Sequence, residues 1–241
     1  MQSEISFNGF PHELVSFYQE LSSNNDRAWF EQNKDRYERH VLKPAALFVE
    51  AMGERLRLIS PRIVADRRTN GAGSIFRIYR DTRFSKDKTP FKTFLGIFFW
   101  EGSRSKMENS GFYFHLEPTQ LMLYGGIYEF TRPMLNTYRD AVVHPERGLA
   151  LRHAVQQVLA VGRCEIGGRH YKKVPAGYDP SHPNAEYLLY NSLYASTGGD
   201  LPGQVFSADL LDYCLDRFTD MAPLHQWIVS VMEGEAGGSW L

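Results

Sequence analysis

The chain has little of what would assign it to a function class at once. Its 241 residues include two cysteines, Cys164 and Cys214, in no CxxC or other metal-binding spacing. They favour a reduced, cytoplasmic protein rather than a disulfide framework. The longest apolar run, Phe94–Trp100, is far shorter than the roughly 20 residues that a membrane span requires. The opening MQSEISFNGF has no basic start and no apolar stretch, so it does not resemble a signal peptide. We therefore expect a cytoplasmic protein with no membrane partner.

Motifs for metals, cofactors and nucleophilic catalysis are also missing. None of the eight histidines forms an HxH or HExxH pattern. The sequence contains no GxSxG elbow, no P-loop and no GxGxxG. The glycine-rich piece at 71–74 precedes a strand pattern rather than a helix, so it does not indicate a dinucleotide loop. We expect no metal and no cofactor, and the sequence leaves open both the oligomeric state and whether the protein is an enzyme.

What is present is an ordinary globular composition, with 43% hydrophobic and 14% aromatic residues. Helical periodicity is found over Pro11–Leu21, Asp26–Leu42 (with Asn25 as N-cap), Pro44–Leu58, Arg132–Val143, Pro145–Val161, Ser181–Leu189 and Ser207–Glu233, the last with a possible break at Pro223. Alternation or an apolar run predicts strands at Ser74–Asp81, Phe94–Trp100, Phe112–Glu117 and Gln120–Tyr124, and Lys172–Tyr178 is expected to be extended. This order predicts a single α+β domain over residues 1–241, with a mainly antiparallel central sheet between N-terminal and C-terminal helices and a frayed tail over 234–241.

The strongest local feature is the segment from Arg77 to Lys92, RIYRDTRFSKDKTPFK. It contains six basic and two acidic residues, a net charge of +4, in a chain whose formal net charge is −1. Its first strand, up to Asp81, is expected to pair antiparallel with Phe94–Trp100 because the intervening residues carry turn chemistry. A basic segment between apolar strands indicates a surface that receives an anion.

The pattern RxxRDxRFxxDKxPFK over this segment resembles the motif of an uncharacterised, mostly bacterial family catalogued as domain of unknown function 2461. Three further stretches resemble it: NNDRAWFEQNKDRY at 24–37, FYFHLEP at 112–118 and KKVPAGYDPSHPNAEYLLY at 172–190. The resemblance therefore covers nearly the whole chain, but it brings no activity with it. One departure is Phe91, where the family commonly has tyrosine, which implies that an aromatic ring matters there and a hydroxyl does not.

The motif supports two readings. In the first it is an anion site, formed by Arg77, Arg80, Asp81, Arg83, Lys86, Asp87, Lys88 and Lys92, of which at least three basic side chains should face one cavity. In the second it is a salt-bridged scaffold that pins the loop to acidic residues of the helix at 26–42. In either reading Asp81 is expected to orient Arg77 or Arg83, and Asp87 to hold a turn.

Two other groups are candidates. Arg27, Trp29, Asn33 and Lys34 share a polar and aromatic helix face that could line the same pocket, or could simply cap and pack the helix. His115 lies on the polar side of its strand beside Tyr113 and Glu117, so it is the acid/base candidate. Its alternative is a hydrogen-bonded or solvated histidine.

Three functions remain open. The first is binding or conversion of an anionic small molecule, phosphorylated or carboxylated, in a basic cleft. The second is binding of single-stranded nucleic acid, because arginines with aromatic neighbours suit base stacking, although the near-neutral charge disfavours it. The third is a structural or interaction protein in which the motif only holds the fold.

Overall fold

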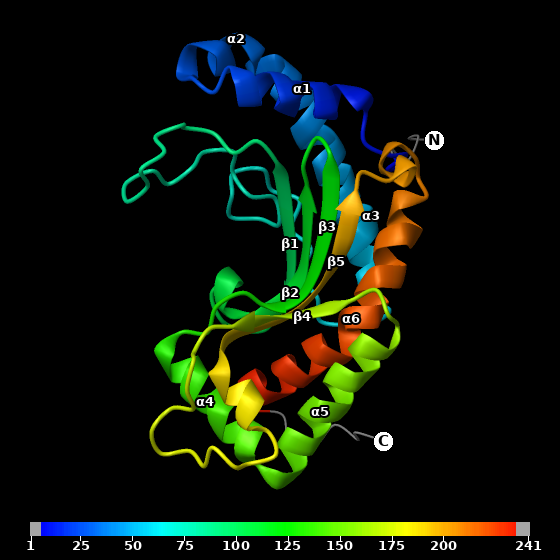
Figure 1. Ribbon diagram of the computed structural model, residues 1–241. Coiled ribbons are helices and arrows are strands. Elements are labelled where there is room, and N and C mark those ends of the chain that lie inside the picture. Colours follow the sequence, from blue (N-terminus) through cyan, green and yellow to red (C-terminus); the bar gives the residue numbers. More distant parts are fainter. Residues whose placement is uncertain (1–5, 235–241) are drawn as a thin grey trace.

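The computed structural model describes residues 6–234 and contains a five-stranded antiparallel sheet with helices before and after it, which confirms the predicted α+β class (Figure 1). The helical elements are α1 (His12–Ser23), α2 (Arg27–Tyr37), the π-helical turn η1 (Glu38–Leu42), α3 (Lys43–Leu56), η2 (Lys106–Glu108), α4 (Arg132–Val143), α5 (Pro145–Ala160), η3 (Ala185–Leu189), η4 (Gly203–Phe206) and α6 (Leu210–Glu233). The strands are β1 (Leu95–Glu101), β2 (Ser110–Leu116), β3 (Gln120–Ile127), β4 (Glu165–Arg169) and β5 (Tyr190–Asp200), in the order β1-β2-β3-β5-β4. The predicted frayed tail lies, from residue 235 on, outside the described residues.

The N-terminal helices follow their sequence pattern with one correction. Asp26, not Asn25, caps α2, and its carboxylate accepts a hydrogen bond of 2.9 Å from the backbone N–H of Trp29. The π-helical turn η1 then joins α2 to α3 without a break. Pro44 lies directly after this turn, at the start of α3, and its missing N–H removes one backbone hydrogen bond from the continuous helix.

One face of the sheet forms the core against α3 and α6, which lie together on that side in Figure 1. Phe112 and Phe114 point to this face as their alternation predicts. The ring centroid of Phe114 lies 4.8 Å from that of Phe48 in α3, and that of Phe112 lies 5.0 Å from that of Phe218 in α6. The sheet therefore has one covered face and one face left for other uses.

Gly125 in β3 sets how closely α6 approaches the sheet. A Cβ atom at this position would lie 2.7 Å from Cβ of Met221. We expect Gly125→Ala to lower the free energy of unfolding by about 1–3 kcal/mol, because the helix must move off the sheet. Urea denaturation measures the effect. Gly203→Ala is the control, since a Cβ there meets nothing within 4 Å, and equal stability of the two variants would show that α6 adapts freely.

The predicted strand at Ser74–Asp81 is wrong as a continuous strand. The structure has isolated antiparallel bridges there, Ile75 to Ile97 and Tyr79 to Phe91. The antiparallel direction is as expected, but Tyr79 pairs within the motif and not with the central strand. Pro90 has no N–H to donate, so the ladder around Tyr79 is limited to a few bonds, and residues 85–93 form no helix.

The second half of the sheet was not predicted. The segment Lys172–Tyr178 forms turns rather than an extended strand, whereas β4 and β5 were missed. β4 carries a bulge between Gly167 and Arg169, and the positive φ of 112° at Gly168 suits glycine. The predicted break at Pro223 does not occur, and the short helix expected from Ser181 is the 3₁₀ turn η3. Within residues 6–234, no helix has the length and apolarity to cross a membrane.

Candidate functional site

The open face of the sheet carries a row of tyrosines. Tyr113 of β2, Tyr124 of β3 and Tyr194 of β5 come from neighbouring strands and point away from the core helices, as strand alternation requires. Their ring centroids lie 5.9 Å apart from Tyr113 to Tyr124 and 5.8 Å apart from Tyr124 to Tyr194. The three rings form a continuous aromatic floor.

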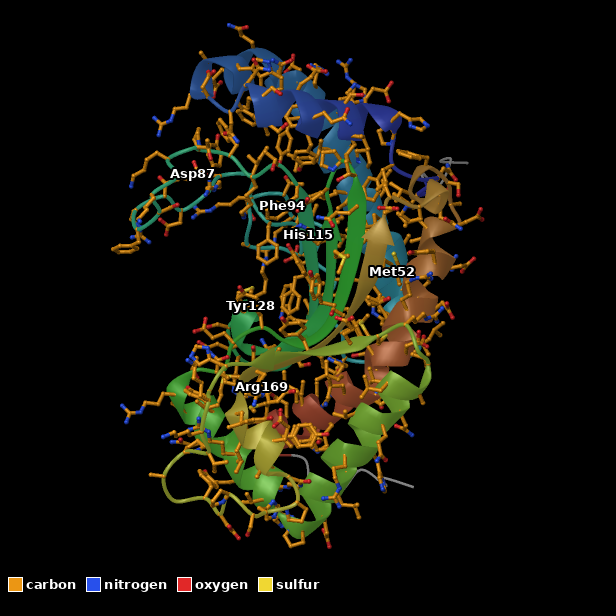
Figure 2. All side chains as sticks on the ribbon, in the orientation of Figure 1. Met52, Asp87, Phe94, His115, Tyr128 and Arg169 are labelled. Carbon is orange, nitrogen blue, oxygen red and sulfur yellow. The ribbon has the colours of Figure 1, made fainter. Side chains whose placement is uncertain are left out.

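A cavity of about 470 Å³ lies on this floor. It is lined by Phe76, Lys92, Phe94, Phe98, Met107, Asn109, Gly111, Tyr113, His115, Tyr124, Gly126, Tyr128 and Tyr194. A Cβ at Gly96 would lie 2.6 Å from the Tyr113 hydroxyl and 3.1 Å from Cδ2 of Phe76, so this glycine makes room for both rings. Figure 2 shows Phe94 and His115 on the open side of the sheet, with Tyr128 further along it toward Arg169.

His115 belongs to a hydrogen-bonded chain in the cavity floor. Its Nε2 lies 2.9 Å from the Glu117 carboxylate, and its Nδ1 lies 3.1 Å from the Tyr113 hydroxyl. The hydrogen bond from His115 lowers the pKa of Glu117, whose other oxygen accepts a bond from Gln120. With a neutral imidazole, Nε2 carries the hydrogen because the carboxylate only accepts, so Nδ1 accepts and the Tyr113 hydroxyl donates. Burial raises the pKa of the Tyr113 hydroxyl, so this group keeps its hydrogen. Because that hydrogen is engaged with His115, the Tyr113 oxygen can only accept a hydrogen bond from a ligand.

Lys92 brings the charge of the basic motif into this cavity. Its ammonium donates to the carbonyl of Arg77 at 2.9 Å and lies 5.3 Å from the Phe76 ring centroid. Burial, and then the nearby Arg77, lower the pKa of Lys92. Among the described residues, no carboxylate forms an ion pair with it. Lys92 is therefore a partly buried cation whose charge no carboxylate of residues 6–234 compensates.

Lys106 places a second ammonium on the same aromatic ring. It lies 4.3 Å from the Phe76 centroid and donates to the carbonyl of Gly73 at 2.6 Å. Burial, followed by repulsion from Lys92, lowers its pKa. The two lysines give this end of the cavity a positive field.

The other charged residues of the motif hold the loop itself. Arg80 donates to Asp87 at 2.5 Å and to the carbonyl of Thr89 at 3.2 Å, while the N–H of Thr89 donates to Asp87 at 2.9 Å. The bonds from Thr89 and Arg80 lower the pKa of Asp87 to about 2. These contacts are the internal scaffold of the second reading, but they stay within the loop and do not reach acidic residues of α2.

Asp81 orients Arg83, one of its two expected partners, through a bond of 2.7 Å. This bond lowers the pKa of Asp81 to about 2. Both side chains are exposed, so the pair is a surface contact rather than a buried bridge.

The remaining cations of the motif do not line the cavity. Lys88 donates to the carbonyl of Thr82 at 2.8 Å, whereas Arg77 and Lys86 are exposed. The expectation that at least three basic side chains face one cavity is therefore not met here, because Lys92 alone of the six is part of its lining. In Figure 2, Asp87 lies out on the loop, away from His115.

The second predicted group, on α2, makes packing and helix-internal contacts or faces solvent. The ring centroid of Trp29 lies 5.6 Å from that of Phe17, and the Asn33 amide donates to the Trp29 carbonyl at 2.9 Å. Arg27 and Lys34 are exposed and are not among the cavity residues.

Two residues next to this group hold the motif in place. The Asn25 side chain both donates to and accepts from the backbone of Phe91, at 3.0 Å each way. The Phe30 ring stacks on the Phe91 ring, with 4.3 Å between centroids. The motif is thus attached to α2 by an amide and two rings, and not by ion pairs.

Most of the aromatic lining was missed from the sequence. Tyr124 was placed in a strand but given no role, and Tyr194 lies in the unpredicted β5. A usable signal existed in the alternation of Ser192, Tyr194 and Ser196 with Leu193 and Ala195. No cluster of His, Cys, Asp or Glu side chains that could hold a metal occurs within residues 6–234.

Comparison with known proteins agrees with the sequence resemblance. A comparison with curated proteins found no match. The family described as a conserved hypothetical protein, DUF2461, matches residues 13–227. Because this match spans most of the chain, including both the basic motif and the tyrosine floor, the protein belongs to the DUF2461 family.

Proposed function

We propose that the cavity on the open sheet face binds a small molecule that joins a flat ring to an anionic group, a phosphate or a carboxylate. The observation that carries this proposal is Lys92, an ammonium at the wall of an aromatic cavity with no carboxylate of the described chain to neutralise it. A partly buried cation without a counter-ion favours an anion brought by a ligand.

The aromatic floor supports the second half of the proposal. Tyr113, Tyr124 and Tyr194 offer ring surface on which a planar group can stack. The Tyr113 oxygen can accept a hydrogen bond from an N–H or O–H of that ligand, because its own hydrogen is engaged with His115. In this arrangement His115 is a positioning residue for Tyr113.

Phenyl phosphate is the simplest probe of this site. We expect it to bind and to raise the melting temperature, whereas phenol and inorganic phosphate, each with half of the features, bind more weakly. Lys92→Gln should weaken phenyl phosphate binding by roughly 10- to 100-fold, the range for a hydrogen bond to a charged group. Isothermal titration calorimetry measures the affinities of the three compounds for the wild type and for Lys92→Gln, and thermal unfolding measures the melting temperature.

Lys86→Gln is the matched control. It removes the same charge from the same motif, but Lys86 is exposed and lies outside the cavity lining. Equal losses in the two lysine variants would show that the anion is held by the general field of the loop, and would contradict a site at Lys92.

Single-stranded nucleic acid is the second candidate, and Phe84 is the observation that favours it. This ring is 95% exposed at the tip of the basic loop, with the Arg83 guanidinium 5.8 Å from its centroid. Aromatic and arginine side chains in this arrangement can stack on bases. Tight oligonucleotide binding with a steep salt dependence, lost in Phe84→Ala and retained in Lys92→Gln, would replace the first proposal by this one.

A further inference from the structure

A second hollow of about 320 Å³ adjoins the tyrosine-floored cavity. The two share Tyr128 and Tyr194, so those rings stand between them. The second hollow is otherwise lined by Glu129, Gly168, Arg169, Asn191 and Ser192. This hollow is formed at the bulge of β4 and the end of β3. Its lining is mainly polar, whereas the lining of the first cavity is mainly aromatic.

Three polar side chains in this hollow have no partner in the part of the chain that the structure describes. Within residues 6–234, neither the Glu129 carboxylate, the Asn191 amide nor the Ser192 hydroxyl makes a side-chain hydrogen bond or ion pair. Arg169 is the one cation of the lining, and its charge is already balanced by Glu186 at 2.9 Å. One carboxylate is therefore left uncompensated beside two tyrosine rings.

We propose that this hollow receives a positively charged amino group of the same ligand whose ring and anion occupy the neighbouring cavity. The inference rests on the proposed function and narrows its ligand class to zwitterions. Glu129 supplies the counter-charge, and Ser192 and Asn191 supply oxygen acceptors for ammonium hydrogens. The faces of Tyr128 and Tyr194 attract a cation through their ring quadrupoles.

The charge pattern of the whole groove is consistent with this ligand. Lys92 and Lys106 make the Phe76 end positive, and Glu129 makes the other end negative. A molecule with an anion at one end and an amine at the other fits this polarity in one orientation only, since reversing it places like charges together.

The experiment uses phenyl phosphates that carry a para alkyl chain of short, medium or long length. Each is made in two forms, one ending in an ammonium and the other in a methyl group. At one chain length the ammonium form should bind the protein about fivefold more tightly than its methyl counterpart, the size of a partly exposed cation–π and charge contact. In Glu129→Gln this ratio should fall to the smaller part that the two tyrosine rings supply, while binding of the methyl form stays unchanged.

Glu54→Gln is the matched control, because it removes an exposed carboxylate from α3, on the covered side of the sheet. It should preserve the ammonium preference. If all compounds bind in a Lys92-dependent way but the ammonium forms show no advantage at any length, or the advantage is undiminished in Glu129→Gln, this inference is overturned and the proposed function stands. If neither form binds, both are overturned.

Discussion

Glu101→Ala is expected to lower the free energy of unfolding by about 3 kcal/mol, because it breaks a buried polar cluster. Glu101 is 8% exposed, and its carboxylate accepts hydrogen bonds from Ser60 and from Arg62, the latter at 2.9 Å. Nε2 of His225, a fully buried residue of α6, lies 3.4 Å from the same carboxylate, and its Nδ1 lies 2.9 Å from the Ser110 hydroxyl. Removing the carboxylate leaves buried donors without an acceptor.

The same cluster predicts acid sensitivity. Burial raises the pKa of Glu101, but the hydrogen bonds from His225, Ser60 and Arg62 together outweigh it and lower the pKa to about 2. A carboxylate with a lowered folded-state pKa contributes stability that is complete above its ordinary pKa of 4.5 and is lost as the pH falls toward 2. Protonation of Glu101 and its removal are thus expected to destabilise the fold through the same buried hydrogen bonds.

Urea denaturation from neutral pH down to pH 2 tests both statements. The wild type should lose more stability over the acid range than Glu101→Ala does. Glu54→Ala, an exposed site without a partner among the described residues, is the control and should behave as the wild type. Parallel pH profiles for the wild type and Glu101→Ala would show that other groups carry the acid response.

Phe91→Ala is expected to cost about 3–4 kcal/mol of stability, the second large effect. The Phe91 ring is 2% exposed and lies between Phe30, with 4.3 Å between centroids, and Tyr79, at 5.3 Å. Its backbone is held by Asn25 on both sides. Truncating the ring leaves a void under the basic motif and removes the ring contact with Phe30 of α2, so that the Asn25 hydrogen bonds to the backbone remain as the attachment.

Phe84→Ala is the matched control in the same motif, since its ring is 95% exposed. It should change stability by no more than about 0.5 kcal/mol. Thermal or urea unfolding of the two variants makes the comparison, and a small effect of Phe91→Ala would mean that the motif is not anchored through this ring. Phe91→Tyr should be tolerated only if the new hydroxyl finds a partner in this buried position.

The elements that could be predicted from the sequence are those with a strong local pattern. The N-terminal helices, the β2–β3 hairpin and α6 have clear periodicity, and packing on one face enforces it. β5 was missed because its alternating part is short, from Ser192 to Ser196, and is followed by Gly198 and Gly199, which weaken a strand pattern; its position between β3 and β4 completes the strand.

The site was less predictable because its parts are distant in sequence. The basic motif was correctly singled out as a feature, but its arginines form bonds inside the loop, and only the tertiary fold brings Lys92 to Tyr113 and Tyr194. The chain from Tyr113 through His115 to Glu117 follows from strand alternation and was predictable. Which face of the sheet would remain uncovered was not, because the chain order of the helices does not state where they pack.

The bridges along β1 have a consequence for association between molecules. The backbone of the irregular segment before β1 bonds to the outer edge of that strand, through Val64, Ser74 and Phe76. At the opposite edge, the bulge of β4 interrupts a regular ladder. An open strand edge invites pairing with a second chain and growth into aggregates. The loop that carries the family motif therefore belongs to a segment that covers the outer edge of β1. Variants that weaken the bonds of this segment to β1 should lose solubility at high concentration even where the cavity is unchanged.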